Sequence, residues 1–119
     1  MSKVLVVDDE PDIRFMHRRI LAKAGHEVTE AGDGAMALAA VRAWAPDLVI
    51  TDMMMPIMSG VELIRRLRED PATAMIPVLS VSGDSQLAGQ ADMVLSKPCL
   101  TASLLAAVEE LLLKGRGTR

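Results

Sequence analysis

The sequence contains almost no aromatic residues: it has no tyrosine, one phenylalanine (Phe15) and one tryptophan (Trp44). A hydrophobic core must therefore be built mainly from Val, Leu, Ile, Met and Ala, in a chain that is 50% hydrophobic. The only cysteine, Cys99, excludes an internal disulfide and a zinc site made of several cysteines. We therefore expect Cys99 to behave as a small hydrophobic residue.

Long apolar runs are missing as well. No run approaches the roughly 18 residues of a membrane-spanning helix, so no membrane span is expected. The N-terminal residues 1–4 enter a strand pattern at once and lack the layout of a signal peptide. The net charge is −3, and the basic residues do not cluster as in nucleic-acid-binding proteins. These features favour a cytoplasmic protein that binds no nucleic acid.

The hydrophobic content is sufficient for one folded domain. With 119 residues, the chain is long enough for a substantial core and too short for two ordinary domains. We predict one domain over residues 1–119, with its core within 3–113 and a short flexible tail at 114–119. Three arginines, Arg65, Arg66 and Arg68, fall in a helical pattern and are expected to form a solvated face.

Strand and helix patterns alternate along the chain. Apolar or alternating runs predict strands over 4–7, 27–31, 48–51, 77–81 and 92–96. Helical spacing predicts helices over 11–24, 35–44, 60–69 and 101–112, and a segment of only one or two turns at 84–90. Asp33 and Thr101 are expected to cap the helices that follow them. This alternation indicates an α/β fold with a parallel sheet and helices on both faces.

Polar side chains stand at the ends of four predicted strands. Asp8 and Asp9 follow the first strand, Asp52 the third, Ser82 the fourth and Lys97 the fifth. Because the carboxyl ends of parallel strands lie at one edge of a sheet, we expect these side chains to share one crevice. Crowded carboxylates repel one another unless a cation offsets their charge, and Mg²⁺ prefers such oxygen ligands. The sequence therefore predicts a magnesium site.

Each of these residues also has a simpler interpretation. Asp52 alone is typical of a turn, Asp8 and Asp9 of helix capping, Ser82 of a turn hydroxyl, and Lys97 of a surface charge. Their coincidence at four strand ends favours a functional site. A metal, a lysine and a hydroxyl around one carboxylate are what phosphoryl transfer to that carboxylate requires.

The chain resembles the receiver domain of two-component response regulators, in its stand-alone, single-domain form. The resemblance spans residues 3–113, and Ser82 lies 30 positions after Asp52, as the family pattern requires. It rests on four motifs: Val6-Val7-Asp8-Asp9-Glu10-Pro11, Asp52-Met53-Met54-Met55-Pro56 followed by Gly60, Ser82-Gly83, and Lys97-Pro98. We also expect the last motif to form a rigid turn, with a cis peptide bond as one option.

This resemblance implies a flavodoxin-like fold, a doubly wound (βα)5 parallel sheet with strand order 2-1-3-4-5. It implies that Asp52 accepts a phosphoryl group. It further implies that Asp9, Asp52 and the backbone carbonyl of Met54 bind Mg²⁺ directly, with Asp8 acting through water.

The resemblance also implies a signalling function. Ser82 and Lys97 would contact the phosphoryl oxygens. The donor would be a histidine kinase or a phosphotransfer protein, and the phosphorylated domain would change conformation and contact an unknown downstream protein or serve as a phosphate relay. Such a domain is no ordinary enzyme, because it catalyses only its own phosphorylation and slow dephosphorylation. Whether it forms a homodimer stays open.

Two features depart from the family pattern. The family usually has an aromatic residue three positions before the lysine, and Val94 stands there instead. The stretch from Ser82 to Lys97 is about two helical turns shorter than usual, at ~3.6 residues per turn. We therefore expect a shortened or irregular fourth helix at 84–90.

These departures keep two other functions open. The first is a phosphorylation-independent interaction module, which the complete acidic pocket opposes. The second is a hydrolase that uses Asp52 as a nucleophile, which the lack of room for a substrate-selecting cap opposes. The methionines after Asp52 are expected to pack within their loop, and His17 falls on the buried stripe of the first helix.

Overall fold

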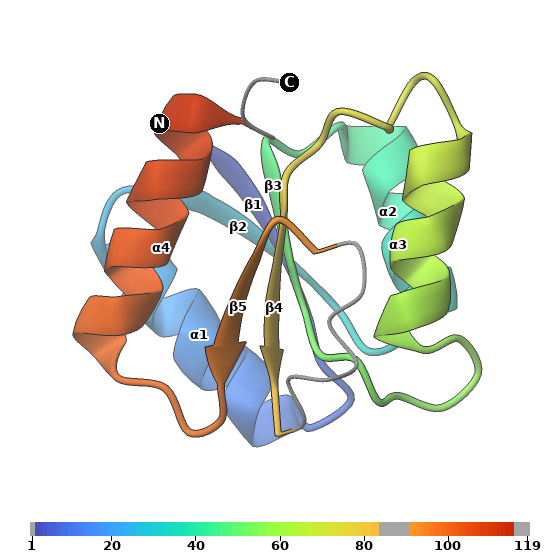
Figure 1. The fold of residues 1–119 in the computed structure, drawn as a ribbon. Helices are drawn as coiled ribbons and strands as arrows, with labels where there is room; N and C mark the ends of the chain where they lie inside the picture. Colours follow the sequence, from blue (N-terminus) through green and yellow to red (C-terminus); the bar gives the residue numbers. More distant parts are fainter. Residues whose placement is uncertain (1, 84–90, 116–119) are drawn as a thin grey trace.

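A central parallel sheet organises the molecule (Figure 1). The computed structural model describes residues 2–83 and 91–115. All strand pairs are parallel, and the strand order is β2-β1-β3-β4-β5. The strands are β1 (Lys3–Val7), β2 (Glu27–Ala31), β3 (Leu48–Thr51), β4 (Val78–Ser82) and β5 (Met93–Ser96). The predicted α/β class and strand order are confirmed.

Helices cover both faces of this sheet. They are α1 (Pro11–Lys23), α2 (Gly34–Trp44), α3 (Gly60–Glu69) and α4 (Thr101–Lys114). Helices α2 and α3 pack together on one face, and α1 and α4 lie on the other (Figure 1). The segment predicted as a short helix, 84–90, lies outside the described residues, as does most of the predicted tail.

Local hydrogen bonds explain where the helices begin. Asp33 Oδ1 accepts the Met36 backbone N–H at 2.8 Å, which confirms the predicted cap of α2. Ser59 Oγ accepts the Glu62 N–H at 3.1 Å at the start of α3. The predicted cap of the last helix is wrong, because α4 already includes Thr101 and has no side-chain cap bond.

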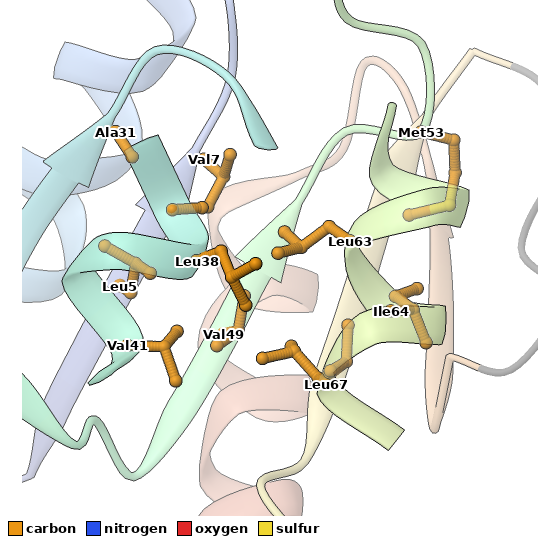
Figure 2. Close-up of a cluster of buried hydrophobic side chains, with 12 residues drawn as sticks. Leu5, Val7, Ala31, Leu38, Val41, Val49, Met53, Leu63, Ile64 and Leu67 are labelled. Atoms are coloured by element: carbon orange, nitrogen blue, oxygen red, sulfur yellow. The ribbon is translucent and has the colours of Figure 1, made fainter. Parts of the chain in front are cut away.

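Two apolar clusters share the central strands. Along β1, Leu5 and Val7 face α2 and α3, whereas Val4 and Val6 face α1 and α4. Figure 2 shows the first cluster, in which Val49 of β3 meets leucines from the two helices. This alternation buries β1 and β3 on both sides, which is why both read as continuous apolar runs.

One expectation about the surface is wrong. Arg65 and Arg66 are exposed as predicted, but the Arg68 side chain is only 10% exposed. Its guanidinium Nη2 lies 2.7 Å from Asp92 Oδ2, just before β5. The helical pattern could not distinguish Arg68 from its neighbours, because the partner is 24 residues away.

Candidate functional site

The acidic residues converge at the carboxyl end of the sheet because β1 and β3 are neighbours. Val7 pairs with Thr51, and the Asp52 N–H donates to the Val7 carbonyl at 3.0 Å. The residues that follow these two strand ends must therefore lie side by side. Carboxylate oxygens of three residues lie within 4.8 Å of one another: Asp8, Asp9 and Asp52. Asp8 and Asp52 are 2% and 7% exposed, whereas Asp9 is exposed.

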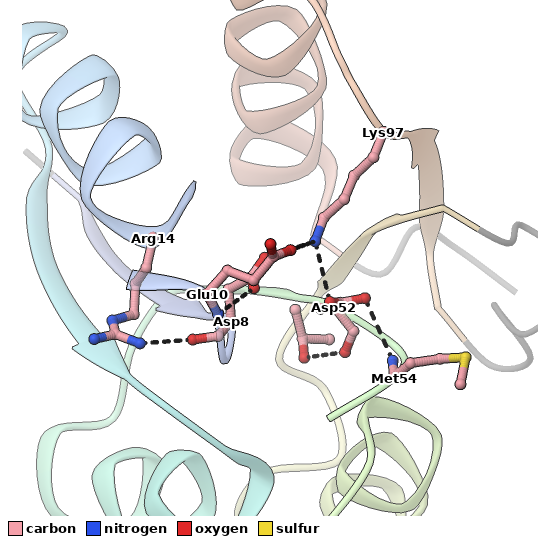
Figure 3. Close-up of polar contacts among 7 residues, drawn as sticks. Asp8, Glu10, Arg14, Asp52, Met54 and Lys97 are labelled. Carbon is pink, nitrogen blue, oxygen red and sulfur yellow. Dashed lines mark hydrogen bonds and ion pairs between the residues drawn. The ribbon is translucent and has the colours of Figure 1, made fainter. Parts of the chain in front are cut away.

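Lys97 brings an ammonium group into this cluster (Figure 3). Its Nζ donates to Asp8 Oδ2 at 2.9 Å and to Asp52 Oδ2 at 3.0 Å. Glu10 Oε1 lies 3.6 Å from the same nitrogen. The backbone N–H of Lys97 donates to the Ser82 carbonyl at 2.9 Å, which ties the residue to the end of β4. The peptide bond from Lys97 to Pro98 is cis.

These contacts keep Lys97 charged. Burial alone would lower the pKa of Lys97, because desolvation disfavours the ammonium form. The hydrogen bonds to Asp8 and Asp52, together with their negative charges, outweigh burial and raise the pKa above its ordinary value. The site therefore holds a permanent positive charge beside the Asp52 carboxylate.

Asp52 is held at both its backbone carbonyl and its carboxylate. Thr51 Oγ1 donates to the Asp52 carbonyl at 2.8 Å, and the Met54 N–H donates to Asp52 Oδ1 at 3.3 Å. The start of α3 presses against the same carbonyl, since a Cβ on Gly60 would lie 2.0 Å from it. Gly60 also donates to the Met53 carbonyl at 2.9 Å. Because it has no side chain, Gly60 lets the start of α3 pack directly against the Asp52 backbone, a role that the sequence interpretation missed.

The loop of residues 53–59, which connects the site to α3, forms one wall of an open cleft beside the acidic cluster. A cavity of about 460 Å³ is lined by Asp9, by residues 53–56 and 59 of this loop, and by Val61 of α3. Met53 is buried in the core cluster beside α3, whereas Met54 is 65% exposed, so the expectation that the methionines after Asp52 pack within their loop is wrong for Met54. The cleft leaves room for another molecule to approach the carboxylates.

Ser82 lies at the carboxyl end of β4, and Val94 lies within the neighbouring edge strand β5. Ser82 is the last residue of β4 and is 2% exposed, and Ser96 of β5 pairs with it. Val94 pairs with Ser80 and is 37% exposed. The structure thus places Ser82 at the predicted edge of the sheet, whereas Val94 lies two residues before the end of β5.

The donor set suits a hard divalent cation. Three carboxylates stand against one ammonium, so the cluster retains an excess of negative charge that such an ion would neutralise. All of these side-chain donors are oxygens, and no sulfur or imidazole ligand joins the cluster within residues 2–83 and 91–115. Oxygen donors of this kind fit Mg²⁺.

Comparison with known proteins identifies the family. The sequence model of the response regulator receiver domain matches residues 4–109. The chain belongs to this family. Receiver domains bind Mg²⁺ at an acidic pocket, and the Asp8, Asp9 and Asp52 cluster supplies such a pocket here. None of the helices in residues 2–83 and 91–115 has the length and hydrophobicity of a transmembrane segment.

Several receiver-containing proteins are similar to this chain. RpaA, a DNA-binding dual master transcriptional regulator of Synechocystis, is 35% identical over 94% of this chain, which spans 49% of its length. PilH of Pseudomonas aeruginosa is 36% identical over 72% of this chain and 71% of its own length. The chain thus spans about half the length of the first curated relatives it matches, and much more of PilH.

Solved structures agree with this assignment. The chemotaxis response regulator CheY4 of Vibrio cholerae is 34% identical, with a TM-score of 0.87 over 93% of this chain and 98% of its own. TrrA of Thermotoga maritima, solved in complex with Mg²⁺ and BeF, is 30% identical, with a TM-score of 0.85 over 93% and 99%. The flavodoxin-like receiver fold is therefore confirmed.

Proposed function

We propose that this domain accepts a phosphoryl group on Asp52 from a phosphohistidine, in a reaction that needs Mg²⁺. One observation carries the proposal: the Lys97 ammonium lies 3.0 Å from Asp52 Oδ2, within a cluster of three carboxylates. A nucleophilic carboxylate thus stands beside a fixed cation and a set of metal-binding oxygens. Together these groups match the requirements of phosphoryl transfer.

In the proposed reaction, an Asp52 carboxylate oxygen attacks phosphorus in line with the leaving imidazole nitrogen. The O–P bond forms as the P–N bond breaks, and the imidazole leaves with the bonding electron pair. Lys97 and Ser82 bind the equatorial oxygens, where negative charge gathers. Asp9, Asp52 and the Met54 carbonyl would hold Mg²⁺, with Asp8 acting through water, and the bound ion would neutralise further charge.

The partners of this reaction are protein molecules. The donor is a histidine kinase or a phosphotransfer protein, acting in the cytoplasm, and phosphorylation biases the domain between two conformations. A downstream protein then reads the altered surface, or the domain passes the phosphoryl group on. The only reactions catalysed are phosphorylation and slow dephosphorylation of Asp52 itself.

A mass measurement tests this proposal directly. The protein is incubated with acetyl phosphate and Mg²⁺, and its intact mass is recorded beside that of an Asp52→Asn variant. We expect one phosphoryl adduct that is absent from the variant and absent when EDTA removes the metal. An adduct on both proteins, or none on either in the presence of Mg²⁺, would overturn the proposal.

A second candidate function is a phosphorylation-independent interaction module. Val94 favours it, because a valine cannot swing between buried and exposed positions as an aromatic side chain does. The test is to measure Mg²⁺ binding alongside formation of the phosphoryl adduct. A protein that binds Mg²⁺ but forms no adduct would favour the interaction module over the phosphoacceptor.

A further inference from the structure

Arg14, outside the acidic cluster, holds the peptide that joins Asp8 to Asp9. The guanidinium Nη1 of Arg14 donates to the Asp8 carbonyl oxygen at 2.7 Å. Its Nε donates to Glu30 Oε1 of β2 at 2.9 Å. Figure 3 shows Arg14 and Lys97 approaching Asp8 from opposite sides. Arg14 therefore contacts the backbone of the turn while Lys97 contacts its carboxylate.

Two other hydrogen bonds of Asp8 help to fix the turn between Asp8 and Asp9. We call these contacts, together with the Arg14 hydrogen bond to the Asp8 carbonyl, the Arg14 clamp. Its N–H donates to the Ala31 carbonyl at 3.2 Å, and its Oδ1 accepts the Glu10 N–H at 2.9 Å. Ala31 follows Glu30 at the end of β2. Both backbone polar groups of Asp8 are thus attached to β2, one directly and one through Arg14 and Glu30.

Asp9 depends on this clamp more than its neighbours do. Its carboxylate makes no hydrogen bond or ion pair with any residue in 2–83 or 91–115, although it lies within 4.8 Å of the Asp8 and Asp52 ligand oxygens. The peptide between Asp8 and Asp9 is planar, so holding the Asp8 carbonyl also fixes the plane from which Asp9 extends. The direction of the exposed carboxylate therefore depends on where Arg14 holds this plane.

We infer that Arg14 is a positioning residue that aims the Asp9 carboxylate at the metal. The inference deepens the proposed function and rests on it. Only an arginine fits, because its planar fork donates in two directions at once, whereas a lysine ammonium cannot span both acceptors in the same geometry. The residue acts through the backbone and touches neither metal nor substrate.

The sign of the effect separates positioning from simple charge. Arg14 carries a positive charge near three carboxylates and would repel Mg²⁺ bound there. Charge alone therefore predicts tighter Mg²⁺ binding once the positive charge of Arg14 is removed. Positioning predicts weaker binding. Arg18 is a matched control: its Nη1 donates to Glu30 Oε2 at 3.0 Å, but its side chain is 52% exposed and is not bonded to the Asp8–Asp9 turn.

The test is calorimetric titration of the purified protein with Mg²⁺. We expect Arg14→Gln and Arg14→Lys each to raise the dissociation constant about tenfold, at the lower end of the usual effect of groups that support metal ligands. Arg18→Gln is expected to bind as the native protein does, or slightly more tightly. Thermal unfolding of all variants checks that each is folded at the titration temperature.

The outcomes are distinguishable. Native-like binding by Arg14→Lys, tighter binding by Arg14→Gln, or equal weakening by Arg18→Gln would each overturn the role of Arg14 and leave the proposed function intact. If the native protein binds Mg²⁺ but acetyl phosphate leaves no adduct on it, the proposed function fails while the role of Arg14 is still measured. Absence of Mg²⁺ binding by the native protein would overturn both.

Discussion

A buried ion pair joins Arg68 of α3 to Asp92, the residue before β5. Asp92 Oδ2 lies 2.7 Å from Arg68 Nη2 and also accepts the Val78 N–H at 2.8 Å. Arg68 Nη1 donates to the carbonyls of Ala74 and Ile76 at 3.1 and 2.8 Å. With the two side chains 10% and 7% exposed, the pair satisfies charges that water scarcely reaches. Through its bonds to these two carbonyls, Arg68 also holds the segment between α3 and β4 in place.

Removing one charge of this pair is expected to destabilise the domain. Asp92→Asn leaves the Arg68 guanidinium buried without its counterion, so we expect the free energy of unfolding to fall by about 3 kcal/mol. Urea denaturation measures the change. Glu110→Gln, which breaks the exposed pair with Lys114, is the control and should change little. A loss for Asp92→Asn no larger than that of the control would contradict the prediction.

His17 links the stability of the domain to pH. The side chain is 4% exposed, and burial lowers the pKa of His17 from its ordinary value of 6.5; Asp8 opposes this shift and Lys97 adds to it. The unfolded chain therefore binds this proton more readily than the folded chain does. Stability contributed by the neutral imidazole is present above pH 6.5 and is lost as the pH falls below it.

This linkage predicts a change in the pH dependence of unfolding. In His17→Gln, the decline in unfolding free energy between pH 6.5 and pH 5 should be shallower than in the native protein. One proton accounts for at most about 1.4 kcal/mol per pH unit. Urea denaturation at several pH values measures both slopes. Parallel slopes would show that His17 does not contribute to them.

At the level of elements, the contact between β3 and α3 decides where Asp52 sits. Helix α3 begins so close to the end of β3 that a Cβ on Gly60 would lie 2.0 Å from the Asp52 carbonyl oxygen and 2.8 Å from the Met53 Cα. Both atoms belong to the backbone and cannot move aside cheaply. A glycine is therefore required for α3 to support the loop that carries Asp52.

A methyl group at this point should separate the two elements. We expect Gly60→Ala to lower the free energy of unfolding by about 2 kcal/mol or more and to slow adduct formation from acetyl phosphate. Gly32→Ala is the matched control for stability, because its Cβ would meet no atom nearer than Arg14 Nη1 at 3.5 Å, an ordinary contact distance. The two substitutions should therefore differ in the free energy of unfolding. Equal behaviour would show that α3 can shift without disturbing Asp52.

For the molecule as a whole, the site connects strand ends that are far apart in the sequence. Lys97 contacts Asp8 across 89 residues and Asp52 across 45. These contacts exist only when β1, β3, β4 and β5 are all in place. Anything that binds the site therefore stabilises the entire fold.

Mg²⁺ should raise the global stability of the domain. At a concentration 100 times its dissociation constant, a ligand of the folded state adds about 2.7 kcal/mol. We expect Mg²⁺ to raise the unfolding midpoint, EDTA to reverse the rise, and Asp9→Asn to abolish most of it. Thermal or urea unfolding with and without Mg²⁺ measures this. A rise of equal size in Asp9→Asn would place the ion elsewhere.

Much of the fold could be predicted from local patterns. The apolar runs at 4–7 and 48–51 predict strands buried on both faces, and Pro11 and Asp33 mark helix starts that the structure confirms. Arg68 could not be assigned, because its helical spacing matches that of its exposed neighbours. The contacts of Arg14 and Gly60 were missed for the same reason, because both lie outside the residues' own elements.

The sequence by itself determined the alternation of strands and helices, the family, and which side chains stand at the strand ends. These follow from periodicity and from the order of residues along the chain. Only the tertiary structure decided how those side chains are held: the 2.9 and 3.0 Å contacts of Lys97, the seat of Asp52 against Gly60, and the Arg14 clamp on Asp8. Such distances depend on the register and packing of distant segments, which no local pattern specifies.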